Sequence, residues 1–110
     1  MNKQTFTKDI FEEIKAERKR QDEKFGEQNH SLRNKFFDCG HCKGKENFYR
    51  KINKKEDFRF SWLTVLLEEV YEAFSTKNMQ KQREEMIQVA AVTVAIIECL
   101  DRRITEQEQP

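Results

Sequence analysis

Two groups of acidic side chains carry the clearest chemical pattern in the sequence. Glu69 and Glu72 are three residues apart in the string LLEEVYEAF, and Glu85 and Gln88 repeat that spacing before the apolar string VAAVTVAII. Helical residues three apart project from one face, about one turn from each other. If the two strings form neighbouring antiparallel helices, the two pairs can face each other.

Carboxylates that converge in this way repel one another unless a cation lies among them. Hard divalent ions such as Mg²⁺ or Mn²⁺ prefer oxygen ligands and keep open positions for water and phosphate. The pattern therefore suggests metal-assisted phosphate chemistry. The alternative is that the glutamates, which are good helix formers, lie on solvated faces. The adjacent apolar strings favour the metal site, because free charges are costly beside them.

Hydrophobic periodicity predicts the helices that would position these acids. Phe6, Ile10 and Ile14 recur at four-residue spacing, which predicts an amphipathic helix from about Thr7 to about Lys24. A glycine and the turn-forming string EQNHS follow it.

Two further helices are predicted in the second half of the chain. One begins after Ser61, a suitable N-cap, and the other extends from about Met79 to about Thr105. The centre of the last helix, MIQVAAVTVAII, is apolar on nearly every side, so it must be buried all round. In so small a protein that burial requires a helix from another subunit. Residues 105–110 are predicted to form a frayed tail.

The expected fold is therefore all-α, an oligomeric helical bundle with an N-terminal helix and two long core helices in a single domain, 1–110. Residues 31–60 are predicted to be an irregular basic and aromatic segment, in which FYRKINKKEDFRF could form a short helix between loops. From Arg33 to Arg59 the chain has nine basic and four acidic residues. This segment could bind a flat anionic ligand. Alternatively, its aromatic rings pack on the bundle while its lysines face water.

Composition excludes several classes of protein. The 110 residues suffice for one domain, and 21 basic against 20 acidic residues leave a net charge of +1. That balance argues against nucleic acid as a partner. The first residues lack the apolar core of a signal peptide, and no apolar run is long enough for a membrane span. Three cysteines do not suit a secreted disulfide scaffold, so a cytoplasmic protein is expected.

The strings around the acids resemble a small branch, found in phages and bacteria, of the MazG-like nucleotide pyrophosphohydrolases. The resemblance rests on ERKRQDEKFGEQNH, WLTVLLEEVYEA and REEMIQVAAVTVAIIECLDRR, within Ile14 to His30 and Trp62 to Arg103. Enzymes of this family are all-α and carry ExxE on one helix and ExxD on the next. They use these acids to hold Mg²⁺ and to split nucleoside triphosphates into monophosphate and pyrophosphate.

The resemblance implies a role for each matching residue. Glu69, Glu72 and Glu85 would be metal ligands, and Glu69 or Glu72 would position the attacking water. Glu68 would be a second acid that orients a ligand or that water. Gln88 would be the fourth ligand, although it replaces the family's aspartate and its amide cannot act as a base.

The substrate would be held partly by the end of the first helix and the turn after it. The implied substrate-binding residues there are Lys24, Phe25, Gln28, Asn29 and His30. Cations that could steady the leaving pyrophosphate are Lys24, Lys81, Arg102 and Arg103. Alternative hypotheses are a protein that sequesters a nucleotide without turnover and a helical interaction module whose acids only solubilise it.

Cys39 and Cys42 form a CxxC pair outside the resemblance. Their spacing fits half of a zinc site, with His41 or His30 as a third ligand, and also a thiol–disulfide centre. The simplest interpretation is a pair of free thiols in a loop.

Overall fold

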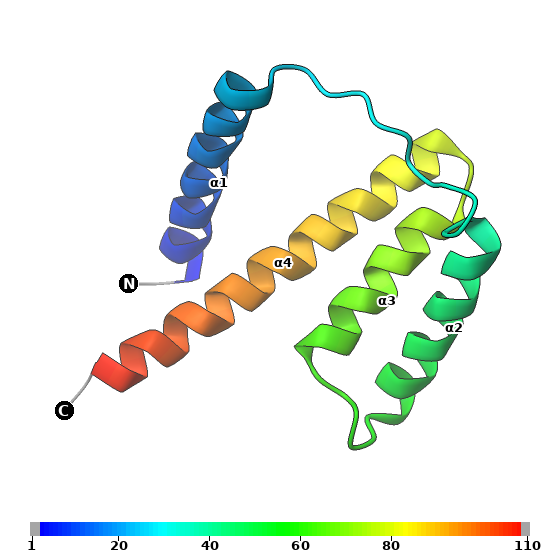
Figure 1. Ribbon diagram of the computed structural model, residues 1–110. Helices are drawn as coiled ribbons and strands as arrows, with labels where there is room; N and C mark the ends of the chain where they lie inside the picture. The colour runs from blue at the N-terminus through cyan, green and yellow to red at the C-terminus, as the bar shows by residue number, and fades with distance from the viewer. Residues whose placement is uncertain (1–2, 109–110) are drawn as a thin grey trace. The chain divides into compact units, whose positions relative to one another are not determined.

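The computed structural model describes residues 3–108, and the side chains of residues 7–108, as an all-helical protein (Figure 1). No strand occurs within 3–108, so the predicted all-α class is confirmed. None of the helices in this range has both the length and the hydropathy to cross a bilayer. The helices are α1 (Lys3–Phe25), α2 (Cys39–Lys55), α3 (Trp62–Ser75) and α4 (Met79–Glu108).

The chain divides into two compact units, one of residues 1–30 and 94–110 and the other of residues 31–93. In the first unit, Ile10 on α1 and Val94 on α4 are buried, and Thr7 Oγ1 donates to Glu98 Oε2 at 2.7 Å. The predicted apolar face of α1 is thus confirmed at Ile10, whereas Ile14 is exposed and the side chain of Phe6 lies outside the described residues.

The second unit is built on the packing of α2 against α3, which lie side by side (Figure 1). Ile52 of α2 and Ala73 of α3 are fully buried. Ser61 caps α3 as predicted, since its Oγ accepts from the Thr64 amide while Thr64 Oγ1 accepts from the Ser61 amide at 3.0 Å.

Helix α2 corrects the expectation that residues 31–60 are irregular. Asp38 caps this 17-residue helix by accepting from the His41 amide at 2.8 Å. Its inward positions, Cys42, Glu46, Tyr49 and Ile52, follow helical spacing. The pattern is hard to see in the sequence because one inward residue is a glutamate and two glycines, poor helix formers, lie in the first turns.

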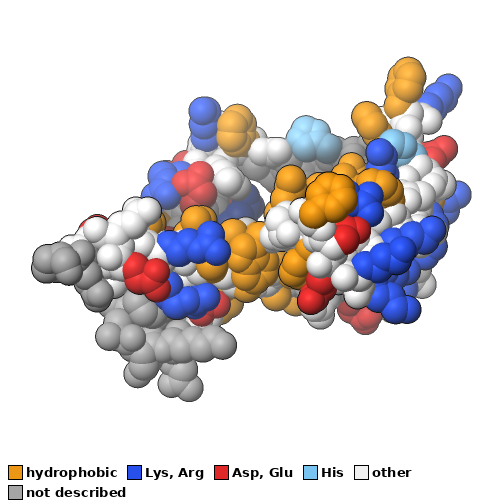
Figure 2. Space-filling view, turned by 90° about the horizontal axis from the view of Figure 1, so that it is seen from below, with side chains coloured by type: hydrophobic (Ala, Val, Ile, Leu, Met, Phe, Trp, Pro, Cys, Tyr) orange, Lys and Arg blue, Asp and Glu red, His pale blue; other side chains and the backbone are white. Residues whose placement is uncertain are grey.

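Some aromatic residues of this segment pack on the helices, whereas others are exposed to solvent. Tyr49 stacks on Tyr71 of α3, with ring centroids 5.9 Å apart, and so packs as predicted. Phe36 and Phe58, in contrast, are 86% and 95% exposed and do not pack on the helices of this unit. Orange hydrophobic side chains are visible at the surface among the charged ones (Figure 2).

Burial of the centre of α4 by another subunit stays a prediction, whereas the end of α4 differs from its expected form. In the single chain its apolar stretch is only partly buried, and Ile87 is 55% exposed. The helix continues to Glu108, so residues 105–108 are helical rather than frayed, and residues 109–110 lie outside the described part.

Replacing the cap of α3 tests this local account. Ser61→Ala should lower the free energy of unfolding by about 1 kcal/mol, because the first turn loses the acceptor for the Thr64 amide. Urea denaturation measures the change. Thr93→Ala is the control, since its exposed hydroxyl bonds only the Val89 carbonyl within α4. Equal losses in the two variants would contradict the capping role.

Candidate metal centre

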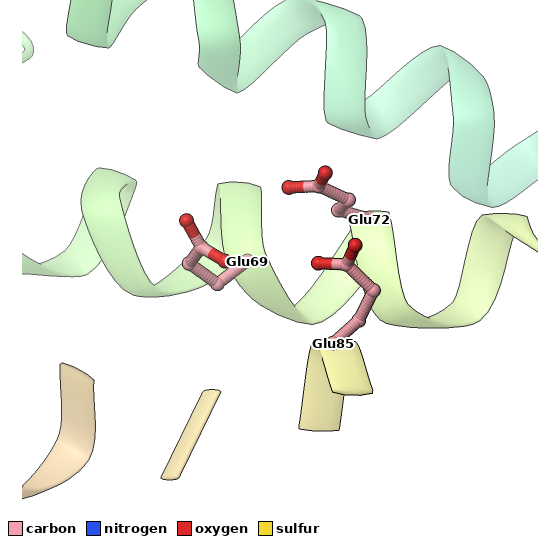
Figure 3. A group of neighbouring side chains, drawn as sticks. All are labelled: Glu69, Glu72 and Glu85. Carbon is pink, nitrogen blue, oxygen red and sulfur yellow. The ribbon is translucent and has the colours of Figure 1, made fainter. Parts of the chain in front are cut away.

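Three carboxylates from two helices converge in the second unit. Glu69 and Glu72 lie on α3 and Glu85 on α4, and one oxygen of each lies within 4.8 Å of the other two (Figure 3). All three side chains are half-buried. The structure thus brings together the three acids that the spacing in the sequence had singled out.

A short connection allows the two helices to present their acids to each other. Helix α3 ends at Ser75 and α4 begins at Met79. Asn78 starts α4, because its Oδ1 accepts from the Lys81 amide at 2.9 Å. Arg33 bonds the last turn of α3 by donating to the carbonyl oxygens of Phe74 and Thr76, at 3.4 and 3.2 Å. Both ends of the connection are therefore held by hydrogen bonds.

The environment of the cluster disfavours three free negative charges. Burial raises the pKa of Glu69 above its ordinary value of 4.5, and the charges of Glu72, Glu68 and Glu85 raise it further. Burial likewise raises the pKa of Glu72, and the charges of Glu85 and Glu46 raise it further. The Arg50 guanidinium opposes both shifts without outweighing them. A cation or a proton is therefore favoured among these oxygens.

The donor atoms suit a hard divalent ion. Carboxylate oxygens are the preferred ligands of Mg²⁺ and Mn²⁺, whereas structural zinc sites use thiolates and imidazoles. Three half-buried carboxylates also leave room for water or phosphate to complete the coordination. Among the described residues, no other group of three His, Cys, Asp or Glu side chains lies close enough to hold an ion.

Two further residues predicted for the centre lie beside it. Glu68 faces α2, where its oxygens accept from Asn53 Nδ2 at 2.8 Å and from Arg50 Nε at 3.4 Å. Gln88 lies one turn beyond Glu85 on α4, and its side chain is exposed. Gln88 therefore lacks the half-buried environment of the three carboxylates, and its role as a fourth ligand stays a prediction.

The predicted substrate-binding residues belong to the first unit and are exposed there. The Lys24 ammonium lies 5.2 Å from the centre of the Phe25 ring. His30 Nε2 lies 2.9 Å from Gln28 Oε1, and Asn29 donates to a neighbouring glutamate. These contacts are local, so the function of all five residues stays a prediction.

Cys39 and Cys42 are free thiols, as the simplest interpretation had it, but they lie in the first turn of α2 rather than in a loop. Burial raises the pKa of the Cys42 thiol, and the charge of Cys39 raises it further. His41 contacts the rings of Phe37 and Tyr71. Among the described residues of this one chain no third ligand joins the two thiols, and the zinc site stays a prediction.

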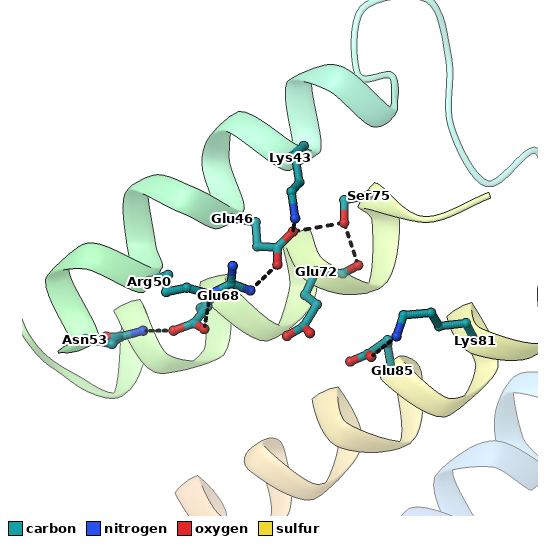
Figure 4. Close-up of polar contacts among 9 residues, drawn as sticks. All are labelled: Lys43, Glu46, Arg50, Asn53, Glu68, Glu72, Ser75, Lys81 and Glu85. Atoms are coloured by element: carbon teal, nitrogen blue, oxygen red, sulfur yellow. Dashed lines mark hydrogen bonds and ion pairs between the residues drawn. The ribbon is translucent and has the colours of Figure 1, made fainter. Parts of the chain in front are cut away.

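Sequence reasoning missed Glu46 and Arg50, both on α2. Glu46 is 2% exposed, and its carboxylate accepts from Ser75 Oγ at 3.0 Å, from Lys43 Nζ at 3.3 Å and from Arg50 (Figure 4). Burial acts to raise the pKa of Glu46, but these hydrogen bonds and the charge of Arg50 hold it below its ordinary value. A glutamate at an inward position of an otherwise apolar helical stripe was the available signal.

Comparisons with protein-family models, with curated proteins and with solved structures find no match to this chain.

Removing one charge from the cluster should stabilise the metal-free protein. Glu69→Gln should raise the free energy of unfolding at pH 7, because it relieves burial and repulsion of a charged carboxylate. The gain should shrink as the pH falls through the raised pKa of Glu69, where the native carboxylate takes up a proton. Below 4.5, the ordinary value, it should be gone.

Urea denaturation in EDTA between pH 7 and pH 4 measures this difference. Glu84→Gln, an exposed neighbour of Glu85, is the matched control and should change stability little. A Glu69→Gln protein that is less stable than the native chain in EDTA would contradict the repulsion.

Proposed function

We propose that this protein is a metal-dependent hydrolase that splits nucleoside triphosphates into monophosphate and pyrophosphate. The observation that carries the proposal is the convergence of Glu69, Glu72 and Glu85 within 4.8 Å at a half-buried position. The resemblance of the surrounding strings to MazG-like pyrophosphohydrolases supports it and specifies the substrate class. The ExxE spacing of that family falls on α3, and Glu85 begins the second motif on α4.

The chain's own residues would act as follows. Glu69, Glu72 and Glu85 would hold Mg²⁺ or Mn²⁺, and the bound ion would neutralise charge on the phosphate oxygens. Glu69 or Glu72 also orients a water molecule and accepts its proton. The water oxygen would bond to the α-phosphorus of the triphosphate, and the bond between that phosphorus and the oxygen that leaves with pyrophosphate would break.

The leaving pyrophosphate requires a cation, and of the four candidates predicted from the sequence Lys81 belongs to the same unit as the acidic cluster. Lys81 Nζ lies 3.9 Å from Glu85 Oε1, at the edge of the cluster. Lys24, Arg102 and Arg103 belong to the first unit. The Lys81 side chain is exposed, so its ammonium group is accessible to a phosphate oxygen as well as to Glu85.

A homo-oligomer in the cytoplasm forms part of the proposal. Ile87 and other apolar residues of α4 are exposed in the single chain, and a second copy would cover them. The three free thiols suit a reducing compartment.

Gln88 favours a second candidate function, nucleotide binding without turnover. In the resembling family an aspartate occupies this position, and glutamine supplies neither its charge nor a base. A protein with this substitution could retain the nucleotide and release it unchanged.

Pyrophosphate release separates the two functions. The native protein, given a panel of ribo- and deoxyribonucleoside triphosphates with Mg²⁺ or Mn²⁺, should release pyrophosphate from at least one of them, and EDTA should abolish release. Glu72→Gln should lower the rate about 100-fold or more, because it removes a proposed ligand. Glu84→Gln should retain the native rate.

Binding of a triphosphate without release would instead support the sequestering function. Gln88→Asp should then create activity. Neither binding nor release across the panel would reject both candidates.

A further inference from the structure

Helix α2 brings a cation to the edge of the acidic cluster. Arg50 Nη2 donates to Glu46 Oε2 one turn earlier on α2, and Arg50 Nε lies 3.4 Å from Glu68 Oε2 on α3 (Figure 4). Two carboxylates from two helices therefore hold the guanidinium. Its orientation is set without any ligand, which lowers the entropy cost of binding one.

Glu46 is the anchor of this arrangement. Its carboxylate is almost fully buried and also accepts from Ser75, in the last turn of α3. A buried carboxylate with several hydrogen bonds holds one position, so the guanidinium paired with it is positioned as well.

The guanidinium retains capacity for a further partner. The Arg50 side chain is 43% exposed, and its Nη1 group donates to no other side chain or carbonyl in the described part of the chain. A guanidinium presents its donors in a planar fork that matches phosphate oxygens. Glu68, which Arg50 contacts at 3.4 Å, lies one turn before Glu72 on the same face of α3, so the guanidinium lies beside the cluster (Figure 4).

Lys81 supplies a second cation on the α4 side of the cluster (Figure 4). The three carboxylates thus have a cation on either side, Arg50 from α2 and Lys81 from α4. Cations at this periphery would weaken the binding of a bare metal ion by repulsion. They would strengthen the binding of a metal ion that carries a polyphosphate anion.

We propose that Arg50 binds a phosphate group of a metal-bound polyphosphate chain and that Glu46 is its positioning residue. The inference deepens the proposed function and rests on it for the nature of the ligand. It gives α2, the segment outside the sequence resemblance, a direct part in substrate binding.

The test uses the full chain, Mn²⁺ and inorganic tripolyphosphate as a probe that has no base or sugar. Titration calorimetry measures first the affinity for Mn²⁺ and then the affinity of the Mn²⁺-loaded protein for tripolyphosphate. Arg50→Gln alone would leave the buried Glu46 carboxylate without its guanidinium partner. The main variant is therefore the double substitution Glu46→Gln with Arg50→Gln. Arg59→Gln is the matched control, since Arg59 belongs to the same unit and pairs with Asp57.

The double variant should bind Mn²⁺ with at least the native affinity and tripolyphosphate about 10- to 100-fold more weakly. Arg50→Lys, which keeps the charge and loses the fork, should lie between them, and Arg59→Gln should match the native protein. If the double variant does not fold, Arg50→Lys decides the question, since native tripolyphosphate affinity in that variant would overturn the proposal.

Three results would overturn it. The first is unchanged tripolyphosphate affinity in the double variant. The second is a loss of Mn²⁺ affinity in that variant as large as its loss of tripolyphosphate affinity, which would give Arg50 a merely structural role. The third is the absence of tripolyphosphate binding by the native protein. Pyrophosphate release that is independent of Arg50 would leave the proposed hydrolysis standing without this inference. Binding that depends on Arg50, with no release from any nucleotide, would leave the inference standing without the hydrolysis.

Discussion

Repulsion among three half-buried carboxylates is the constraint on which the second unit depends. Glu69 and Glu72 of α3 and Glu85 of α4 place their oxygens within 4.8 Å of one another, where burial and like charge both disfavour ionisation. Folding alone gains nothing from such an arrangement, because leucines in these positions would pack without that cost. A divalent cation among the three carboxylates would supply the opposite charge and remove that cost.

Helix α2 also carries a buried carboxylate, Glu46, which contacts the last turn of α3 through Ser75. Glu46 is buried, yet its pKa stays below its ordinary value because Ser75, Lys43 and Arg50 all donate to it. The pKa values of Glu46 and Glu72 are therefore shifted in opposite directions because of their hydrogen-bond partners and neighbouring charges, and not because of burial alone. Glu46 accepts three side-chain hydrogen bonds, whereas no donor within residues 7–108 bonds the Glu72 carboxylate.

Short-range rules were sufficient to predict α3 and α4 from the sequence. Ser61 supplied the cap of α3, and three-residue spacing placed Glu69 and Glu72 on one face. Helix α2 could not be predicted in this way, because its inward stripe contains Glu46, and a buried glutamate is stable only with partners that the fold supplies. Arg50 was missed for the same reason, since Glu68, one of its partners, is 18 positions away. Short-range rules likewise cannot predict whether residues 24–30 contact a substrate, because such contacts depend on tertiary structure.

The most direct test of the account is a Mn²⁺ titration followed by electron paramagnetic resonance, in which the signal of free Mn²⁺ disappears on binding. The account predicts that the native chain binds Mn²⁺ and that Glu72→Gln and Glu85→Gln each weaken the affinity at least roughly tenfold. Glu84→Gln should bind as the native chain does. Native affinity in Glu85→Gln would contradict the account, because α3 and α4 would then not share one metal site.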